Sequence, residues 1–276
     1  MLVQQCHTSP MHVDVISVAP VKSLGLNHPE SVDVTSDGVP GDRRFALIDE
    51  QGRHFSGKRC GALVQVRASH DDAAERLTLA FPDGTKVSEP VMLGGPVDAV
   101  FYGELRPAHL VLGVFAHALS RFADADVRLI RVADGGGVDR RETGVVSIQS
   151  TASLAAIGRE SGAEGVVDGR RFRMTFTIGG ADEHAEDAWI GRRVRVGTAV
   201  IVPEGHTGRC AVTTQHPDTG VPDLDVLKAI AAYRSDIVTT GERLPFGVHA
   251  RVVVPGRVSV GDAVVLDDGP QGSTAG

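Results

Sequence analysis

The stretch RRVRVGTAVIV, residues 192–202, clusters β-branched residues around a central glycine, a pattern typical of β-strands. Similar short runs recur along the chain and are separated by turn signals such as the Asp-Gly pairs at 37–38 and 83–84. A hairpin is expected in LIDEQGRHF, with its turn near 51–52. We expect strands over 12–19, 44–50, 62–68, 76–81, 126–132, 192–202, 247–254 and 262–266.

Helical patterns are few, and they do not alternate regularly with the strands. Apolar residues recur at helical spacing over 109–123, 150–160 and 223–235, and hydroxyl residues suited to helix capping open the second of these segments. No G-x-G-x-x-G leads from a strand into a helix, which argues against a Rossmann dinucleotide site. The predicted fold class is therefore mainly β with a few helices (α+β).

Length and composition narrow the class of protein further. A chain of 276 residues is long for one domain, and its net charge of −7 argues against a general nucleic-acid or membrane-surface role. Three cysteines are too few for a disulfide framework, which favours a reducing cytoplasm. No signal peptide and no stretch of about 18 apolar residues are visible, so no membrane association is expected.

Two polar stretches near the N-terminus contain lysine or arginine side chains of the kind that bind anions. PVKSLGL places Lys22 and Ser23 just after a predicted strand, where they either bind an anion or form a solvated loop. GVPGDRRFALIDEQG begins a strand with two arginines next to Asp42. Either Asp42 pairs with an arginine to fix the turn, or it holds a guanidinium that is aimed at a phosphate.

A third stretch, GRCAVTTQHPDTG, contains Cys210 beside Arg209 and several threonines. A neighbouring guanidinium favours the thiolate, which is both a nucleophile and a ligand for soft metals. An inert core cysteine and a zinc site shared with His206 and His216 are the alternatives.

Taken together and in this order, PVKSL, GVPGDRRFALIDEQG, RFR, AEDAWIG and GRCAVTTQHPDTG resemble the MOSC proteins, a family named for the C-terminal domain of molybdenum cofactor sulfurase. The resemblance runs from about Val13 to Leu266 and is to the two-part branch of amidoxime-reducing components. It implies a β-barrel N-terminal domain over residues 1–108, packed on a MOSC β-barrel domain over 109–276.

The same resemblance implies a site for a molybdenum cofactor, in which molybdenum is bound to molybdopterin. Cys210 matches the residue that supplies a protein thiolate to the metal, and Lys22, Ser23 and Arg43 match residues on the phosphate side of the pterin. Arg173 matches a cofactor-contacting arginine, Arg209 precedes the cysteine, and the hydroxyls of Ser150 and Thr151 fall on a hydroxyl-rich family segment that implies further cofactor contacts.

One family segment differs from the pattern. The family's FRPN reads FRMT here, so that Met174 and Thr175 stand where the family has proline and asparagine. A hydroxyl at this point replaces an amide that both donates and accepts, which changes the contact available to the pterin.

The function implied is a cytoplasmic oxidoreductase that reduces N-oxygenated small molecules such as hydroxylamines or amidoximes. No cysteine follows Cys210 and no dinucleotide fingerprint is present, so a separate redox protein is expected to supply electrons. Two alternatives stay open: a sulfurtransferase that carries a persulfide on Cys210, and a non-catalytic carrier of the cofactor.

Overall fold

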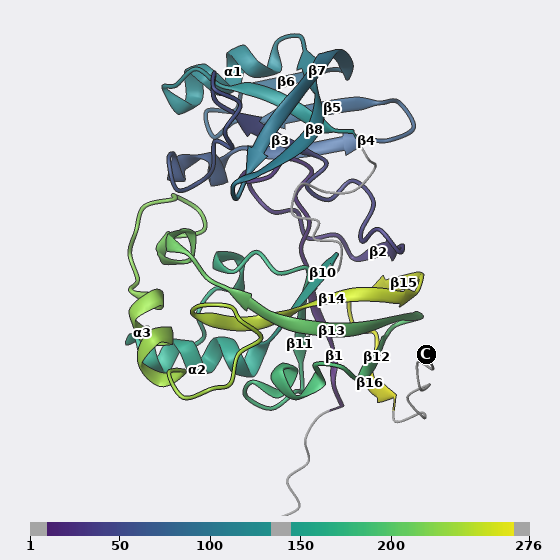
Figure 1. Ribbon diagram of the computed structural model, residues 1–276, viewed down its shortest axis with the longest axis vertical. Coiled ribbons are helices and arrows are strands. Elements are labelled where there is room, and N and C mark those ends of the chain that lie inside the picture. Colours follow the sequence, from purple (N-terminus) through teal and green to yellow (C-terminus); the bar gives the residue numbers. More distant parts are fainter. Residues whose placement is uncertain (1–9, 134–144, 268–276) are drawn as a thin grey trace, which may run out of the picture.

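The computed structural model describes residues 10–133 and 145–267 of the chain, which form two β-rich modules. Figure 1 shows the modules one above the other. The N-terminal module comprises the strands from β3 to β9, and the C-terminal module is built on a larger sheet that also takes in the first strand of the chain. Residues 17–44, here called the connecting segment, run between β1 and β3.

The C-terminal module contains a seven-stranded sheet in which only β10 and β11 run parallel among the pairs described. Backbone hydrogen bonds from β1 to the residues just before β16 (Val13 N to Asp262 O, 2.9 Å) bring the outer strands together into a nearly closed barrel. In sheet order the strands are β1 (His12–Ile16), β11 (Phe176–Gly179), β10 (Val146–Ser150), β14 (Pro245–Val254), β13 (Ala199–Gly208), β12 (Arg193–Val196) and β16 (Val264–Asp267). A separate pair joins β15 (Gly256–Ser259) to β2 (Ser31–Val34).

The N-terminal module packs a four-stranded sheet and a three-stranded sheet around an apolar core that includes Phe45, Leu47 and Leu129. Because β9 pairs with β3, the last strand of this module returns to its first. The four strands are β3 (Phe45–Ile48), β9 (Arg128–Val132), β8 (Glu104–Leu112) and β7 (Met92–Phe101), and the three are β4 (Arg67–Asp71), β5 (Arg76–Ala80) and β6 (Lys86–Pro90).

Three α-helices are described: α1 (Phe115–Ala123), α2 (Thr151–Ser161) and α3 (Val226–Tyr233). The prediction of a helix over 109–123 was wrong in its first third, because residues 109–112 belong to β8 and the chain turns at Gly113 with a φ of 102°. The expected strand over 62–68 was also wrong at its start, where a 3₁₀-helix spans Gly61–Gln65. The hairpin near residues 51–52 is confirmed by a turn that Gly52 N closes on Asp49 O.

The fold class is confirmed as mainly β with three helices. Residues 108 and 109 both lie within β8, so strand pairing marks no boundary there, and the division of the chain at this point stays a prediction. Within residues 10–133 and 145–267, none of the helices has the length and apolar character needed to cross a membrane.

The two modules touch closely at the loop that follows Cys210. A Cβ on Gly61 would lie 2.1 Å from the Gly220 carbonyl oxygen, so this approach of the two backbones depends on glycine. Gln215 Nε2 donates to Gly57 O at 2.8 Å, and Gln65 Nε2 donates to Thr219 O at 3.1 Å. These contacts fix the position of the Cys210 loop relative to the N-terminal module.

Candidate active site

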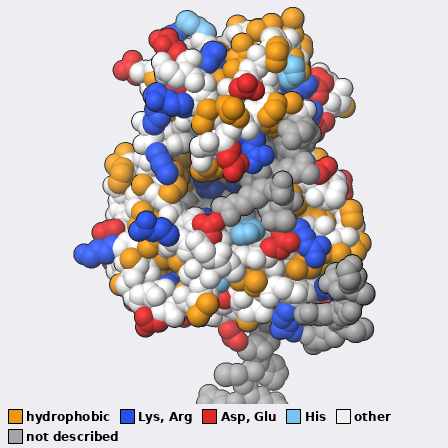
Figure 2. Space-filling model, viewed as in Figure 1, with side chains coloured by type: hydrophobic (Ala, Val, Ile, Leu, Met, Phe, Trp, Pro, Cys, Tyr) orange, Lys and Arg blue, Asp and Glu red, His pale blue; other side chains and the backbone are white. Residues whose placement is uncertain are grey.

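A cleft of about 1100 Å³ lies between the two modules. Figure 2 shows the hollow, with lysine and arginine side chains visible inside it. The connecting segment and the C-terminal module both contribute to its walls. The sequence-predicted site residues that line it are Lys22, Ser23, Arg43, Arg173, Arg209 and Cys210.

Cys210 follows the end of β13 and precedes the 3₁₀-helix η4 (Ala211–Thr214). Its carbonyl oxygen accepts hydrogen bonds from the Thr213 backbone N–H at 3.0 Å and from the Thr213 hydroxyl at 2.9 Å. The thiol is half-buried and forms no disulfide. The backbone therefore fixes this cysteine at the cleft wall without using its sulfur.

Lys22 is a buried cation, with 8% of its surface exposed. Its backbone N–H donates to Phe45 O at 2.8 Å, which anchors the connecting segment to β3. The pKa of Lys22 is lowered well below its ordinary value by burial first and then by Arg43 and Arg173, with smaller opposing effects from Asp42 and Cys210. A lysine in this environment is stabilised in its charged form when an anion binds beside it.

Arg43 joins the connecting segment to the C-terminal module. Its guanidinium forms an ion pair with Asp42 and donates to the backbone carbonyl of Arg173 at 2.7 Å. Asp42 in turn accepts from the Ala19 backbone N–H at 2.7 Å. Asp42 therefore both fixes the turn and holds an arginine at the cleft wall, while the expectation that this arginine faces a phosphate stays a prediction.

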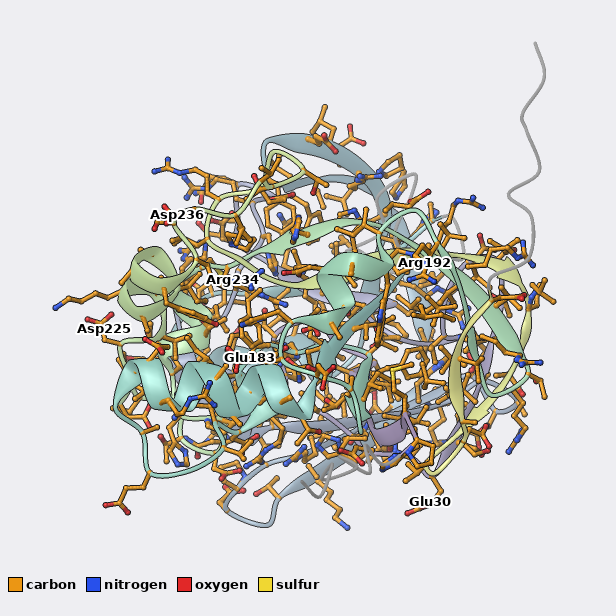
Figure 3. The ribbon with its side chains drawn as sticks, turned by 90° about the horizontal axis from the view of Figure 1, so that it is seen from below. Glu30, Glu183, Arg192, Asp225, Arg234 and Asp236 are labelled. Carbon is orange, nitrogen blue, oxygen red and sulfur yellow. The ribbon has the colours of Figure 1, made fainter. Side chains whose placement is uncertain are left out.

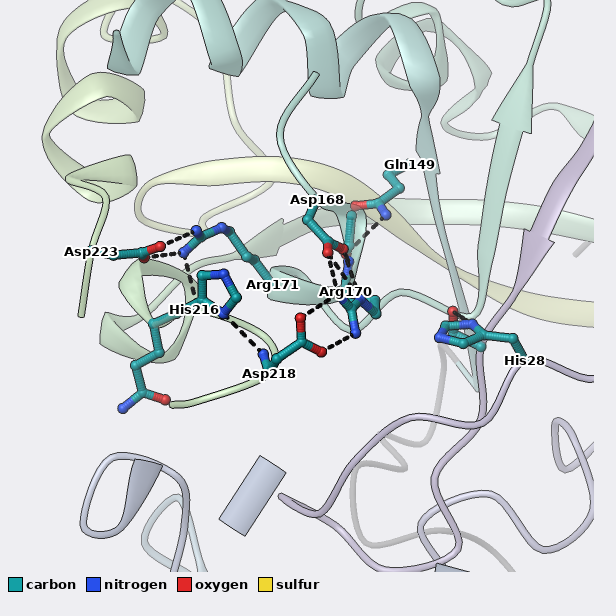
Figure 4. A network of polar contacts seen from close by, with 11 residues as sticks. His28, Gln149, Asp168, Arg170, Arg171, His216, Asp218 and Asp223 are labelled. Atoms are coloured by element: carbon teal, nitrogen blue, oxygen red, sulfur yellow. Dashed lines mark hydrogen bonds and ion pairs between the residues drawn. The ribbon is translucent and has the colours of Figure 1, made fainter. Parts of the chain in front are cut away.

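The arginines of RRFR divide into two groups, as Figure 4 shows for the first. Arg170 binds Asp168 and Asp218, and the buried Arg171 makes a two-pronged contact with Asp223 at 2.7 and 2.8 Å. Arg173 instead donates to the Leu24 backbone carbonyl at 2.8 Å, and both Arg171 and Arg173 line the cleft. Burial, followed by the charge of Arg43, lowers the pKa of Arg173 to about 9.

Three of these cleft residues have strained backbone. Ser23, Arg43 and Arg173 have φ angles of 74°, 51° and 55°, in the left-handed region that favours glycine. Such conformations cost about 1–3 kcal/mol each and cluster at functional sites. Their presence at three cleft positions argues that the side chains are needed where they stand.

Arg209 reaches the cleft wall, but its guanidinium is engaged by the C-terminal module. It donates to the carbonyl oxygens of Phe246 (Nε, 2.8 Å) and Phe172 (2.9 Å), and it also contacts Met174 Sδ at 2.7 Å. Burial lowers its pKa to about 9. Arg209 therefore ties β14 to the segment that precedes β11 and contributes positive charge beside the thiol.

Ser150 and Thr151 are not brought to the cleft. The Ser150 hydroxyl accepts from Ser153 N and caps α2, and it lies beside the buried Glu186, whose pKa is raised by burial. The Thr151 hydroxyl donates to Asp14 at 2.6 Å. Both hydroxyls are committed to the helix start, so we leave these residues out of the proposed cofactor site.

The two residues that depart from the family segment have structural contacts. Thr175 is 2% exposed, and its hydroxyl accepts from the Ser147 backbone N–H at 3.1 Å. Met174 contacts Arg209 as described above. Both residues also line the cleft, with Thr175 tied to β10.

A second polar cluster lies in the C-terminal module away from the cleft. Arg234, 5% exposed, donates to Asp187 at 2.7 Å and to the Pro245 carbonyl at 2.9 Å. Figure 3 shows Arg234 among interior side chains, whereas Asp225 and Asp236 lie at the periphery. His206 also faces Asp187, at 3.4 Å, which explains its burial without a metal.

The zinc alternative for Cys210 finds no support in the described ranges. Among residues 10–133 and 145–267, a metal-compatible grouping of at least three ligand residues occurs at His70, Asp72 and Glu75 and does not include Cys210. There the two carboxylates already bind Arg44 and Arg131 at 2.6 Å each. Cys6 lies outside the described residues.

Tyr102 and His54 are among the cleft residues that the sequence patterns did not indicate. Tyr102 is at the tip of the β7–β8 hairpin, and its hydroxyl accepts a hydrogen bond from Lys22 Nζ at 3.2 Å. His54 packs its ring on Phe101, and burial together with Lys22 and Lys58 lowers its pKa to about 3. Neither residue belongs to a sequence motif, although His54 follows a predicted turn.

Comparisons with known proteins agree with this architecture. A family model described as "MOSC N-terminal beta barrel domain" matches residues 11–98, and one described as "MOSC domain" matches residues 136–265. The protein called mitochondrial amidoxime-reducing component 1 from Homo sapiens is 33% identical over 130 residues, which cover 45% of this chain and 37% of that protein. Its counterpart from Mus musculus is 32% identical over 124 residues, covering 43% and 35%.

These matches span little more than a third of the length of the two curated relatives. Among solved structures, the YUAD protein from Bacillus subtilis aligns over 93% of this chain and 94% of its own, with a TM-score of 0.42 and 14% identity.

Proposed function

This chain belongs to the MOSC family, and on that premise we propose that its cleft binds a molybdenum cofactor for the reduction of N-oxygenated small molecules. The observation that carries the proposal is the presence of a free cysteine and a cation cluster (Lys22, Arg43 and Arg173) in one cleft. The curated relatives named as amidoxime-reducing components support the choice of reaction.

The residues present fit the cofactor on chemical grounds. Lys22, Arg43 and Arg173 lie close enough together that the charges of Arg43 and Arg173 lower the pKa of Lys22 and the charge of Arg43 lowers the pKa of Arg173. A phosphate monoester carries nearly two negative charges at pH 7, and binding it here would favour the charged forms of these three side chains. Molybdopterin has such a phosphate, and its dithiolene-held metal accepts a soft thiolate of the kind Cys210 provides.

Each protein group then has a defined role. Lys22, Ser23, Arg43 and Arg173 would hold the phosphate end of the pterin, and Cys210 would bind the metal. When bound, the cofactor supplies the two-electron chemistry, while the protein binds, orients and shields it. Arg209 holds the backbone next to Cys210 in position through its hydrogen bonds to the Phe172 and Phe246 carbonyls.

The two alternative functions, a persulfide carrier and a non-catalytic cofactor carrier, explain fewer of the features of the cleft. A persulfide carrier requires Cys210 but leaves the buried cation cluster and its strained backbone without a purpose. A non-catalytic cofactor carrier uses the same cluster, and activity with substrate separates it from the reductase.

The experiment for the proposed reductase supplies purified protein with a hydroxylamine or an amidoxime and one of two electron sources. We expect turnover with reduced viologen, and with NADH only when a redox chain of ferredoxin, flavoprotein or cytochrome type is added. Sustained turnover with NADH alone would overturn the proposed need for a separate electron donor. Cofactor-loaded protein that is inactive with every reductant would favour the carrier.

A further inference from the structure

Tyr102 occupies an unfavourable backbone position. Phe101 pairs with Glu104, so Tyr102 and Gly103 form a two-residue turn between β7 and β8, with φ angles of 55° and 90°. Turns of this kind favour Asn, Asp or Gly at both positions, and a bulky aromatic residue in the first is unusual. The sequence keeps tyrosine here against its local conformational preference.

Burial of the Tyr102 side chain does not offset the strain in its backbone. Tyr102 is 80% exposed, so its ring adds little to the core of the N-terminal module. Among its contacts is one with the cation cluster. Lys22 Nζ lies 3.2 Å from the phenol oxygen and 5.4 Å from the ring centroid.

This contact brings the hairpin tip to the place where the cofactor phosphate is proposed to bind. Lys22 is buried, yet the tip of a surface hairpin reaches its ammonium group, and both residues line the cleft. A phenol can accept a hydrogen bond from a lysine and donate one to a phosphate oxygen at the same time. Charge-assisted hydrogen bonds of this type are shorter and stronger than neutral ones.

We propose that Tyr102 is a clamping residue that retains the cofactor by holding its phosphate together with Lys22. The inference rests on the proposed function, because it assumes that the pterin phosphate binds at the cation cluster. The phenol hydroxyl donates to the phosphate, and the ring covers the Lys22 end of the cleft. Tyr102 binds the cofactor and takes no part in the reduction itself.

The test measures how fast cofactor leaves purified, loaded protein after dilution, with released pterin detected by its fluorescence after oxidation. Tyr102→Phe removes the hydroxyl alone and is expected to speed release roughly tenfold, the size of one lost charge-assisted hydrogen bond. Tyr102→Asn removes the ring as well and should release faster still. Leu105→Ala is the matched control, since Leu105 lies 67% exposed on the same hairpin but outside the cleft wall.

A second readout separates clamping from a structural role. Asparagine tolerates the left-handed region, so Tyr102→Asn should raise the melting temperature of cofactor-free protein or leave it unchanged while release accelerates. Equal release rates in wild type, Tyr102→Phe and Tyr102→Asn would overturn this inference and leave the proposed function standing. Wild-type protein that never contains pterin would instead overturn the proposed function.

Discussion

A Cys210→Ser variant is expected to fold like the wild type and to lose reductase activity by at least about 100-fold, equivalent to about 2.7 kcal/mol of transition-state stabilisation. A serine hydroxyl is a harder and far less acidic ligand than a thiol, so it cannot replace the thiolate at a soft metal. The measurement is turnover of an N-hydroxylated substrate with reduced viologen, at matched protein concentrations.

The fold should tolerate this change because the structure uses the backbone of Cys210 and not its sulfur. Thr213 hydrogen-bonds to the Cys210 carbonyl, and serine preserves that contact. Cys60→Ser is the control, since Cys60 is also free but packs against the core of the N-terminal module and does not line the cleft. Near wild-type turnover by Cys210→Ser would show that the thiolate assignment is wrong.

Arg43→Ala should lower the cofactor content of purified protein by about tenfold or more, since charge-assisted hydrogen bonds contribute about 1.5–3 kcal/mol each. The variant removes a guanidinium that stands between Asp42 and the Arg173 carbonyl at the cleft wall. Pterin and molybdenum per chain are the quantities to measure.

Arg44→Ala provides a neighbouring control for the loss of one arginine. Arg44 binds Asp72 at 2.6 Å and lies near Glu75, in an ion-pair network outside the cleft wall. Its loss should leave cofactor content close to that of the wild type. Equal cofactor content in both variants and the wild type would contradict the phosphate clamp, and melting temperatures establish that each variant is folded.

Local sequence patterns predicted much of the fold because alternation and turn residues act over short distances. The run 192–202 forms β12 and the start of β13, joined at Gly197 and Thr198. The helix expected over 109–123 failed because residues 109–112 satisfy the apolar spacing of a helix and of a strand alike. Pairing of β8 with β7 and β9, distant in sequence, decides the outcome there.

The positions of site residues were predictable where a sequence motif determines both the type of side chain and the local conformation of the backbone. Lys22, Ser23, Arg43, Arg173 and Cys210 all line one cleft, and their contact with a cofactor stays a prediction. The predicted hydroxyls of Ser150 and Thr151 did not, because a residue's place in a motif does not reveal whether its hydroxyl caps a helix or faces a ligand.

Tyr102 is a residue that lines the cleft although no sequence motif points to it. A tyrosine before a glycine carries no signal of its own in the sequence. Its proximity to Lys22 arises only when the β7–β8 hairpin folds back toward the connecting segment, across 80 positions of the chain. Contacts of this kind depend on tertiary packing, which local patterns do not encode.

The most direct test of the central claim is the molybdenum and pterin content of the wild-type chain, purified from a host that makes the cofactor. Both are expected in amounts equimolar with the chain, with a lower molybdenum content in Cys210→Ser and a lower pterin content in Arg43→Ala. Wild-type protein free of both, from a host shown to load another molybdoenzyme, would contradict it.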